Sequence, residues 1–463
     1  MRMRIARSRS QEQEDTRKVN AKATAQTVEV TADDEGLISH AGAFLLTELA
    51  DRLGLTKALS AAMAPTRERR SAHDPGRVLR DLVVSIADGG ECVSDLGVLR
   101  GQQALFGAVA SETTARRAVK SIDAAGLDRI RAARAPARAR AWEAGARPDQ
   151  ITLDIDATLL DAHSEKESAV GTYKRGFGFH PLLCYCDESG EALAGVLRPG
   201  NAGSNTAADH FRVLELALEQ LPEADLDREI LARADSGGAT HAFTADCHDA
   251  GIRFSVGYAL DETVRSAILD LDESAWEAAI DAEGETREGA AVAELTGSLD
   301  LAAWPEGTRL ICRRERPHPG AQFEVFDAAG YRHTCFLTDQ PDPDIAALEL
   351  RHRRRARVED AIRTGKDTGM RNLPFADFAS NEAWLELSLA AQDLLTHSKL
   401  LCLDGELAAA EPKRLRQRLL HLAGRIVRSA RRRTLRLPRS WPWAEALVAA
   451  FRRLRSLVAP SPP

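Results

Sequence analysis

The sequence predicts an α/β protein in which a mixed sheet is flanked by helical regions. Three observations lead to this fold class. Apolar residues recur at three- and four-residue spacing from about residue 41 to residue 145, strand-like alternation begins at residue 150, and helical spacing returns after residue 344. The 463 residues are 44% hydrophobic, which is enough for more than one core. No apolar run approaches the roughly 20 residues that span a bilayer, so no membrane segment is expected.

The N-terminal part divides into a tail and a helical region. Residues 1–35 are polar and contain no apolar stretch typical of a signal peptide, so we expect a disordered tail. Residues 36–145 have helical periodicity. Within them, Ser111 begins a capped helix that carries Arg116 and Arg117, as the DNA-contacting helix of a helix-turn-helix does. An ordinary solvated amphipathic helix explains this local sequence equally well.

Residues 146–260 predict the first part of a catalytic core. Three segments alternate as strands, at 151–160, 178–187 and 191–200, and the last two are joined by a hairpin turn. Helices and strands then alternate, with helices at 205–221 and 239–251 and strands at 228–235 and 253–260. A three-stranded meander followed by alternating helices and parallel strands is the order of the ribonuclease H fold, a mixed sheet with helices on both faces.

The remaining residues predict an insertion, the rest of the core and a basic region. Residues 261–343 have an acidic helix-like part followed by the strand-like segments RLICRRER, AQFEVFD and YRHTCFLTD, which indicate an inserted β-rich subdomain. Residues 344–403 are helical and complete the core. Residues 404–463 predict a basic helical region, with an amphipathic helix at 413–433.

Charge is unevenly distributed along the chain. The formal net charge is -7, but residues 401–463 contain fourteen Lys and Arg against four Asp and Glu, a local net charge of +10. Because local charge decides binding, this region is expected to contact a phosphate backbone. The seven cysteines are scattered and odd in number, which fits reduced thiols in the cytoplasm.

Three acidic residues are predicted to converge in such a sheet. Asp156 lies on the first strand, Asp235 ends the fourth strand and Glu359 lies on a late helix. Parallel strands generally place ligands at their carboxyl ends. Three carboxylates there form an oxygen-rich site suited to two Mg²⁺ or Mn²⁺ ions, which promote phosphodiester displacement. For each acid taken alone, a solvated strand end or a paired surface charge is the simpler explanation.

Neighbouring residues strengthen this pattern. Asp154 and Asp156 point to the same face of an apolar strand, where carboxylates are costly without a cation or hydrogen bonds. On the late helix, Arg355 lies four residues before Glu359 and Lys366 lies seven after it, on one helical face. That face is suited to holding a metal beside a phosphate. Ion pairs with Glu359 or Asp360 on a solvated helix are the alternative explanation for these cations.

Several stretches together resemble bacterial insertion-sequence DDE transposases of the cut-and-paste group with a Tyr-x2-Arg-x3-Glu-x6-Lys signature, and most closely insertion sequence family 1380. They are LDIDATLLDAHSEKE, KRGFGFHPLL, LRPGNAGSNTAADH, RADSGGATH and RHRRRARVEDAIRTGKDTG, and the resemblance covers about residues 37–455. Arg355, Glu359 and Lys366 match the signature, whereas His352 stands in the tyrosine position.

The resemblance implies that Asp156, Asp235 and Glu359 are the metal-binding triad, with Asp156 preferred because it begins an Asp-x-Thr pattern. Asp154 remains the alternative first member. Arg355, Lys366 and His352 would bind transposon-end phosphates.

The expected reaction is metal-dependent strand cleavage followed by strand transfer, on terminal inverted repeats and then on target DNA. The partners implied are double-stranded DNA and a second copy of the chain in a synaptic complex, in the bacterial cytoplasm at the nucleoid. Two other functions fit the same residues: a ribonuclease H-like nuclease without strand transfer, and a domesticated DNA-binding protein that no longer cleaves.

Overall fold

The computed structural model describes residues 28–32, 36–67, 72–163, 165–203, 206–317, 329–430 and 432–457. The chain divides into the units Met1–Glu35 and Gly36–Pro463, and the fold below is that of the second. The predicted disordered tail and the predicted strand at 321–327 lie largely or wholly outside the described residues. None of the helices formed by the described residues is long and apolar enough to cross a membrane.

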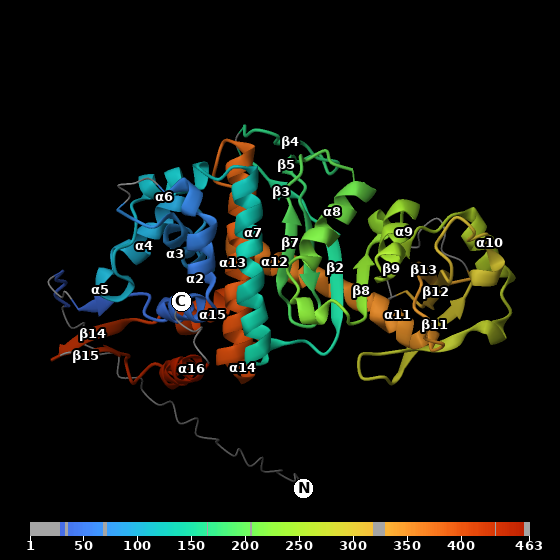
Figure 1. Ribbon diagram of the computed structural model, residues 1–463. Coiled ribbons are helices and arrows are strands. Elements are labelled where there is room, and N and C mark those ends of the chain that lie inside the picture. The colour runs from blue at the N-terminus through green and yellow to red at the C-terminus, as the bar shows by residue number, and fades with distance from the viewer. Residues whose placement is uncertain are drawn as a thin grey trace, which may run out of the picture. The chain divides into compact units, whose positions relative to one another are not determined.

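A nine-stranded mixed sheet dominates the unit, in the order β10-β11-β12-β13-β9-β8-β2-β6-β7 (Figure 1). Its strands are β2 (Ile151–Ala157), β6 (Leu182–Cys186), β7 (Ala192–Val196), β8 (Ile230–Ala234), β9 (Arg253–Tyr258), β10 (Glu277–Ile280), β11 (Thr286–Glu294), β12 (Arg309–Glu315) and β13 (Arg332–Thr338). The predicted mixed α/β class is confirmed. β2, β6 and β7 form the predicted antiparallel meander, and β8 and β9 add parallel strands beside β2.

The second predicted strand is shorter than expected. It was predicted from residue 178, but β6 begins at Leu182 because Pro181 has no N–H to donate to a ladder. The residues before Pro181 form β5 (Phe177–Phe179), which pairs with β3 (Leu160–Asp161) and β4 (Val170–Gly171) in a small separate sheet.

The segment predicted to be an insertion, residues 261–343, contains the strands β10 to β13, which continue the nine-stranded sheet. β13 pairs antiparallel with β9, so β10 to β13 extend the sheet at that edge. The acidic helix-like part was only partly predicted correctly: α10 (Glu262–Asp270) is helical, whereas the alanine-rich residues after it form β10 and β11. Pairing of β10 with β11, and of β11 with β12, overrides their helical propensity.

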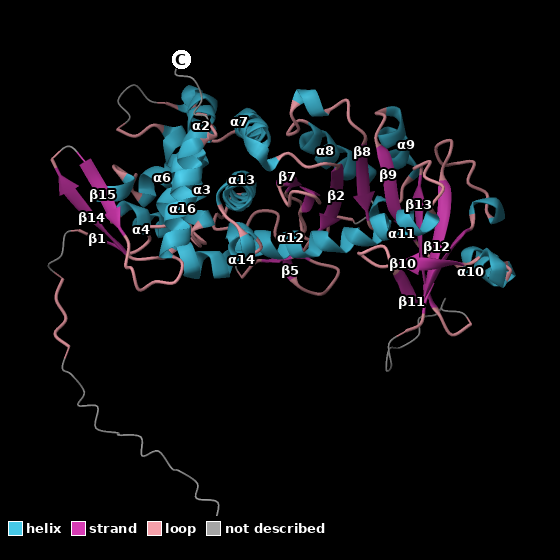
Figure 2. Ribbon diagram, turned by 90° about the horizontal axis from the view of Figure 1, so that it is seen from below, coloured by secondary structure: helices cyan, strands magenta, loops and turns pink. Residues whose placement is uncertain are grey.

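Helices cover both faces of the sheet (Figure 2). α8 (Ala207–Leu218) and α9 (His241–Asp249) lie on one face, and α11 (Ile345–Arg353) and α12 (Arg357–Gly365) lie on the other. Gly251, with φ +69°, follows α9 as predicted. α13 (Phe378–Cys402) is buried along most of its length and packs against both β7 and the helical region.

The helical region consists mainly of α1 (Ala43–Arg52), α2 (Leu55–Ala62), α3 (Pro75–Ala87), α4 (Gly97–Arg100), α5 (Gln103–Phe106), α6 (Glu112–Lys120) and α7 (Ala124–Ala141). These helices confirm the prediction made from the periodicity of the sequence. α1, α3 and α7 all pack against α13, together with α16 (Ala444–Ser456), so one apolar core joins this region to the sheet.

The predicted basic helix at 413–433 is wrong beyond Leu420. α15 (Pro412–Leu415) continues as a wide helical turn, Arg416–Leu420, and the chain then forms the hairpin β14 (Gly424–Ser429) and β15 (Arg432–Arg436). β14 also pairs with β1 (Leu37–Ile38). Gly424 permits this arrangement, because a Cβ there would lie 2.8 Å from Leu435 and 3.0 Å from Ala41.

Candidate active site

The register between β2 and β8 brings two acidic residues to one edge of the sheet. The strands are parallel, and Ile155 lies opposite Ala234. The next residue of each segment is an aspartate. Asp156 lies on β2, and Asp235 directly follows β8. Both stand at the carboxyl ends of neighbouring parallel strands, where α/β sheets generally bind ligands.

Asp156 is a poorly solvated carboxylate close to one cation. Its side chain is 17% exposed, and its Oδ2 lies 3.4 Å from Nη1 of Arg355. Burial raises the pKa of Asp156 to about 6. Arg355 lowers this pKa, whereas the charges of Asp235 and Glu359 raise it. Asp235 and Glu359 therefore both lie within electrostatic range of Asp156.

Asp235 is oriented by the turn that follows β8. Its carboxylate accepts a hydrogen bond of 2.8 Å from the backbone N–H of Gly237, in the Ser236–Gly238 turn. β9 passes close to this turn at Gly257, where a Cβ would lie 3.0 Å from the Ser236 nitrogen. A glycine on β9 thus allows the chain to turn directly at the carboxylate.

Glu359 approaches from α12. Val358 and Ile362 are buried and fix the helix, while Glu359 in its first turn is exposed. Among the described residues it has no hydrogen-bond or ion-pair partner. No choice of one oxygen from each of Asp156, Asp235 and Glu359 places all three within 4.8 Å of one another.

Asp154 has a different environment from Asp156. It is buried and accepts two hydrogen bonds from Arg233 on β8, from Nε to Oδ1 and from Nη2 to Oδ2, both at 2.7 Å. The same guanidinium lies 2.9 Å from Asp187. Burial raises the pKa of Asp154 to about 7, and the hydrogen bonds and charge of Arg233 lower it, so Arg233 compensates the carboxylate only in part.

Lys366 lies in a separate group of charges. It begins the Lys366–Met370 turn after α12, and burial lowers its pKa. Asp161 of β3 raises this pKa and Lys174 lowers it, so both groups are close. Lys366 has no ion pair with Asp156, Asp235 or Glu359 in the described part of the chain.

The histidine in the tyrosine position packs into the protein. His352 lies parallel to Phe336, with ring centroids 4.4 Å apart, and its Nδ1 is 2.8 Å from the Ser255 hydroxyl. Burial, followed by Arg355 and other arginines, lowers its pKa to about 3. The ring is therefore neutral near pH 7 and supports the end of α11.

Arg116 and Arg117 lie on α6, which packs against α3 and α13 rather than the sheet. Figure 1 shows α13 between α6 and β2. Arg116 pairs with Glu112 at 3.0 Å, and Arg117 is exposed. The structure does not bring these arginines to the three acids.

Two neighbours of the acids were not predicted. Arg233 is the partner of Asp154, and the signal in the sequence was a lone arginine inside the apolar strand ILARA. His210 on α8 is the second. Burial lowers its pKa and that of His180, and the nearby charge of Asp235 raises both pKa values. Both imidazoles bond a backbone carbonyl through Nδ1, at 3.1 Å.

Comparison with known proteins identifies the family of the chain. Residues 20–459 match the family model described as transposase DDE domain group 1. A search of curated proteins finds no match. Among solved structures, the chain is similar to the piggyBac transposase synaptic complex with hairpin DNA, with a TM-score of 0.45 and 10% identity over 82% of this chain and 78% of that chain. This structural likeness is too weak to establish the fold. The family match covers nearly the whole sequence, and the chain therefore belongs to the DDE transposase domain group 1 family.

Proposed function

We propose that this protein is a cut-and-paste DNA transposase of the insertion-sequence group with the Tyr-Arg-Glu-Lys signature, close to family 1380. The observation that carries the proposal is the register of β2 and β8, which places Asp156 beside Asp235 within electrostatic range of Glu359. The strand order β7-β6-β2-β8-β9 supports a ribonuclease H-like core made of residues 146–260 and 344–403, with residues 261–343 as the insertion.

The three acids suit divalent metal ions. All donors are carboxylate oxygens, which Mg²⁺ and Mn²⁺ prefer, and Asp156 carries a raised pKa that a nearby cation would lower. Asp156, Asp235 and Glu359 would hold the ions. Two ions about 3.5 to 4 Å apart would stabilise both the attacking and the leaving oxygen. Asp154 is a weaker choice, because Arg233 already pairs with it.

In the proposed reaction, water attacks the phosphodiester at the transposon end and frees a 3′-OH, which then attacks the opposite strand to give a hairpin. After the hairpin is reopened, the 3′-OH attacks target DNA. Bound divalent ions supply stabilisation of the attacking and leaving oxygens. The chain positions the carboxylates through β2, β8 and α12. Arg355, 3.4 Å from Asp156, would contact a phosphate, and Lys366 with Lys174 would supply a separate pair of cations for the DNA backbone.

DNA contacts outside the active site are proposed for two regions. The helical region of residues 36–145 presents Arg116 and Arg117 on α6. The C-terminal region of residues 404–463 presents arginines on β14 and β15, and Arg428, Arg432, Arg433 and Arg436 are exposed. The predicted helix is replaced by a hairpin, but the expected phosphate contact is retained. Holding two transposon ends predicts a homodimer in the synaptic complex, at the bacterial nucleoid.

His352 has a supporting role in this proposal. A DNA contact by this residue remains a prediction. Its Nδ1 already contacts Ser255, and its ring face already contacts Phe336. Its packing holds the end of α11, and Arg355 follows on the next turn.

The test uses the full chain, labelled DNA from both flanks of the coding sequence, and Mg²⁺. Strand-transfer products joined to a target plasmid are expected. Cleavage without joined products under all conditions would favour the nuclease without strand transfer. Specific binding without cleavage in either Mg²⁺ or Mn²⁺ would favour the domesticated DNA-binding protein. Matched inverted repeats bounded by a short direct duplication would support the proposal independently.

A further inference from the structure

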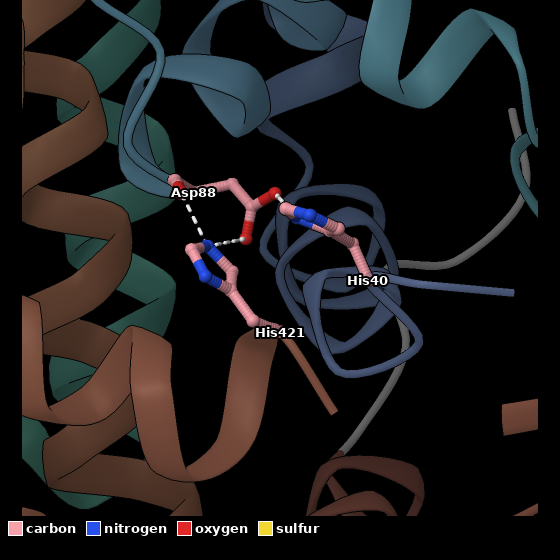
Figure 3. Close-up of side chains that lie close together, drawn as sticks. All are labelled: His40, Asp88 and His421. Carbon is pink, nitrogen blue, oxygen red and sulfur yellow. Dashed lines mark hydrogen bonds and ion pairs between the residues drawn. The ribbon is translucent and has the colours of Figure 1, made fainter. Parts of the chain in front are cut away.

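Three polar side chains from distant parts of the sequence meet away from the acidic site (Figure 3). His40 lies just before α1, Asp88 follows the last residue of α3, and His421 follows the Arg416–Leu420 turn. Figure 3 shows both imidazole rings turned toward the carboxylate of Asp88. In the described part of the chain, this is the one group of three such residues whose ligand atoms all lie within 4.8 Å of one another.

The distances are close to those of a metal site. Nδ1 of His40 lies 2.5 Å from Oδ2 of Asp88, and Nε2 of His421 lies 3.4 Å from Oδ1. Ligand atoms of a tetrahedral ion with bonds of about 2.0–2.1 Å are separated by about 3.3 Å. The His421 separation already fits this value. A rotation of His40, whose side chain is 23% exposed, opens the shorter contact.

Asp88 has an unused acceptor aimed into this group. Its side chain is only 5% exposed, yet Oδ1 accepts no hydrogen bond from the described residues. Nε2 of His421 is 2.8 Å from the backbone oxygen of Asp88 and 3.4 Å from its Oδ1, so its hydrogen bond goes to the backbone. Within the described ranges, Oδ1 thus has only the 3.4 Å contact with Nε2 of His421 and no hydrogen bond. A buried carboxylate oxygen without a hydrogen bond is costly, and a bound cation would stabilise it.

The nearby Arg416 does not fill this need. Its Nε donates to the carbonyl of Ala87 at 2.9 Å, and its Nη1 donates to the carbonyl of Asp367 at 2.8 Å. The guanidinium therefore stabilises the backbone around the end of α3. It partly compensates the charge of Asp88 but leaves Oδ1 unbonded.

We propose that His40, Asp88 and His421 bind a divalent transition-metal ion of the zinc class. Two imidazole nitrogens and one carboxylate oxygen suit Zn²⁺, Co²⁺ or Ni²⁺, whereas Mg²⁺ prefers oxygen ligands alone. The site is therefore chemically distinct from the three acids. Side-chain exposure of 23% for His40 and 40% for His421 leaves room for water as a further ligand.

The role of this ion is structural. His40 follows β1 by two residues, and His421 precedes β14 by three, so both ligands flank the pairing of β1 with β14. Asp88 anchors the same point to α3. A bound ion thus fixes the arginine-bearing hairpin to the helical region, independently of whether the three acids cleave DNA.

Metal binding is measured on the full chain after chelator treatment, with Zn²⁺ and Co²⁺ as probes. One equivalent of Zn²⁺ should bind and raise the Tm, and Co²⁺ should give the visible absorption of a low-coordinate site with nitrogen ligands. Asp156→Asn should bind Zn²⁺ as the unchanged protein does, which separates this site from the acids. His421→Gln should weaken binding at least about tenfold, whereas His248→Gln, an exposed histidine on α9, should have no effect.

Affinity should also fall as pH is lowered, because protons compete with the metal for the two imidazoles. Far-UV circular dichroism without metal verifies that His421→Gln is folded; if it is not, His40→Gln takes its place. Absence of saturable Zn²⁺ binding to the unchanged protein would overturn the proposal. Equal Zn²⁺ affinity in the folded ligand variant would overturn it as well.

Discussion

Arg233 binds Asp154 through two parallel hydrogen bonds of 2.7 Å, while Asp156, two residues further along β2, lies 3.4 Å from a single atom of Arg355. Burial raises the pKa of both aspartates, that of Asp154 to about 7 and that of Asp156 to about 6, but their partners differ. Asp154 is held by a cation of the sheet itself. Asp156 is left with a raised pKa and faces two further carboxylates.

Asp156→Asn is expected to stabilise the metal-free protein. The pKa of Asp156 is about 6 in the folded protein, above its usual 3.8, so this group's contribution to stability falls as pH rises from about 4 to 6. Above pH 6 the charged side chain costs up to about 3 kcal/mol, by the energy of a pKa difference of this size. Thermal unfolding at pH 7.5 should show a gain for the variant that disappears near pH 4.

Asp154→Asn is the matched control on the same strand and should destabilise the protein. It leaves Arg233 buried with only Asp187 as a charged partner, and breaking a buried pair costs about 3–5 kcal/mol. If both variants moved the Tm in the same direction at pH 7.5, the assignment of different roles to the two aspartates would be wrong.

Glu359→Gln is expected to abolish cleavage of transposon-end DNA and to leave binding of that DNA within about twofold. The amide keeps the size of the side chain but removes a charged metal ligand. Asp360→Asn is the control, because Asp360 is also exposed and pairs only with Arg363 at 3.0 Å. Cleavage by Glu359→Gln at the unchanged rate would exclude this residue as a ligand.

Arg355→Gln should shift the pH dependence of Mn²⁺ binding to higher pH. Arg355 lowers the pKa of Asp156, so its removal raises that pKa further above 6, and a protonated carboxylic acid binds metal poorly. Isothermal titration of Mn²⁺ between pH 5 and pH 8 measures the shift. Arg354→Gln, which removes the neighbouring charge, should leave the midpoint unchanged; an equal shift in both variants would contradict the pairing of Arg355 with Asp156.

Arg428→Ala combined with Arg433→Ala tests the hairpin. These arginines lie opposite each other across β14 and β15, and both are exposed. Each lost phosphate contact should reduce the slope of log affinity against log salt by about 0.9. Fluorescence anisotropy with end DNA from 50 to 300 mM salt measures this slope. Arg265→Ala on α10 is the control. An unchanged slope in the double variant would show that the hairpin is not part of the DNA-binding surface.

Much of the core could be predicted because its signals are local. Three local signals predicted the bounds of their elements to within a few residues. They are the alternation in β2, the turn before Glu191, and Gly251 at the end of α9. For the same reason, Asp156 could be placed on the first strand and Asp235 at the end of the fourth. Arg233 could not be assigned, because its partner depends on the register that sets it opposite Asp154.

The C-terminal hairpin could not be distinguished from a helix by periodicity. Leu415, Leu419, Leu422 and Ile426 fit one helical stripe, and the strands that replaced the helix depend on pairing with two residues near the other end of the sequence. The group of His40, Asp88 and His421 could not be predicted for a similar reason, because His421 is 333 residues from Asp88 in the sequence.

The pairing of β1 with β14 also sets an order for folding during synthesis. Leu37 and Ile38 emerge early from the ribosome, but their partners Arg425 and Gly424 are added only when more than nine-tenths of the chain has been made. Contacts between such distant residues form late. An interrupted polypeptide therefore lacks the arginine hairpin, and only a chain translated through residue 436 presents this positively charged surface to DNA.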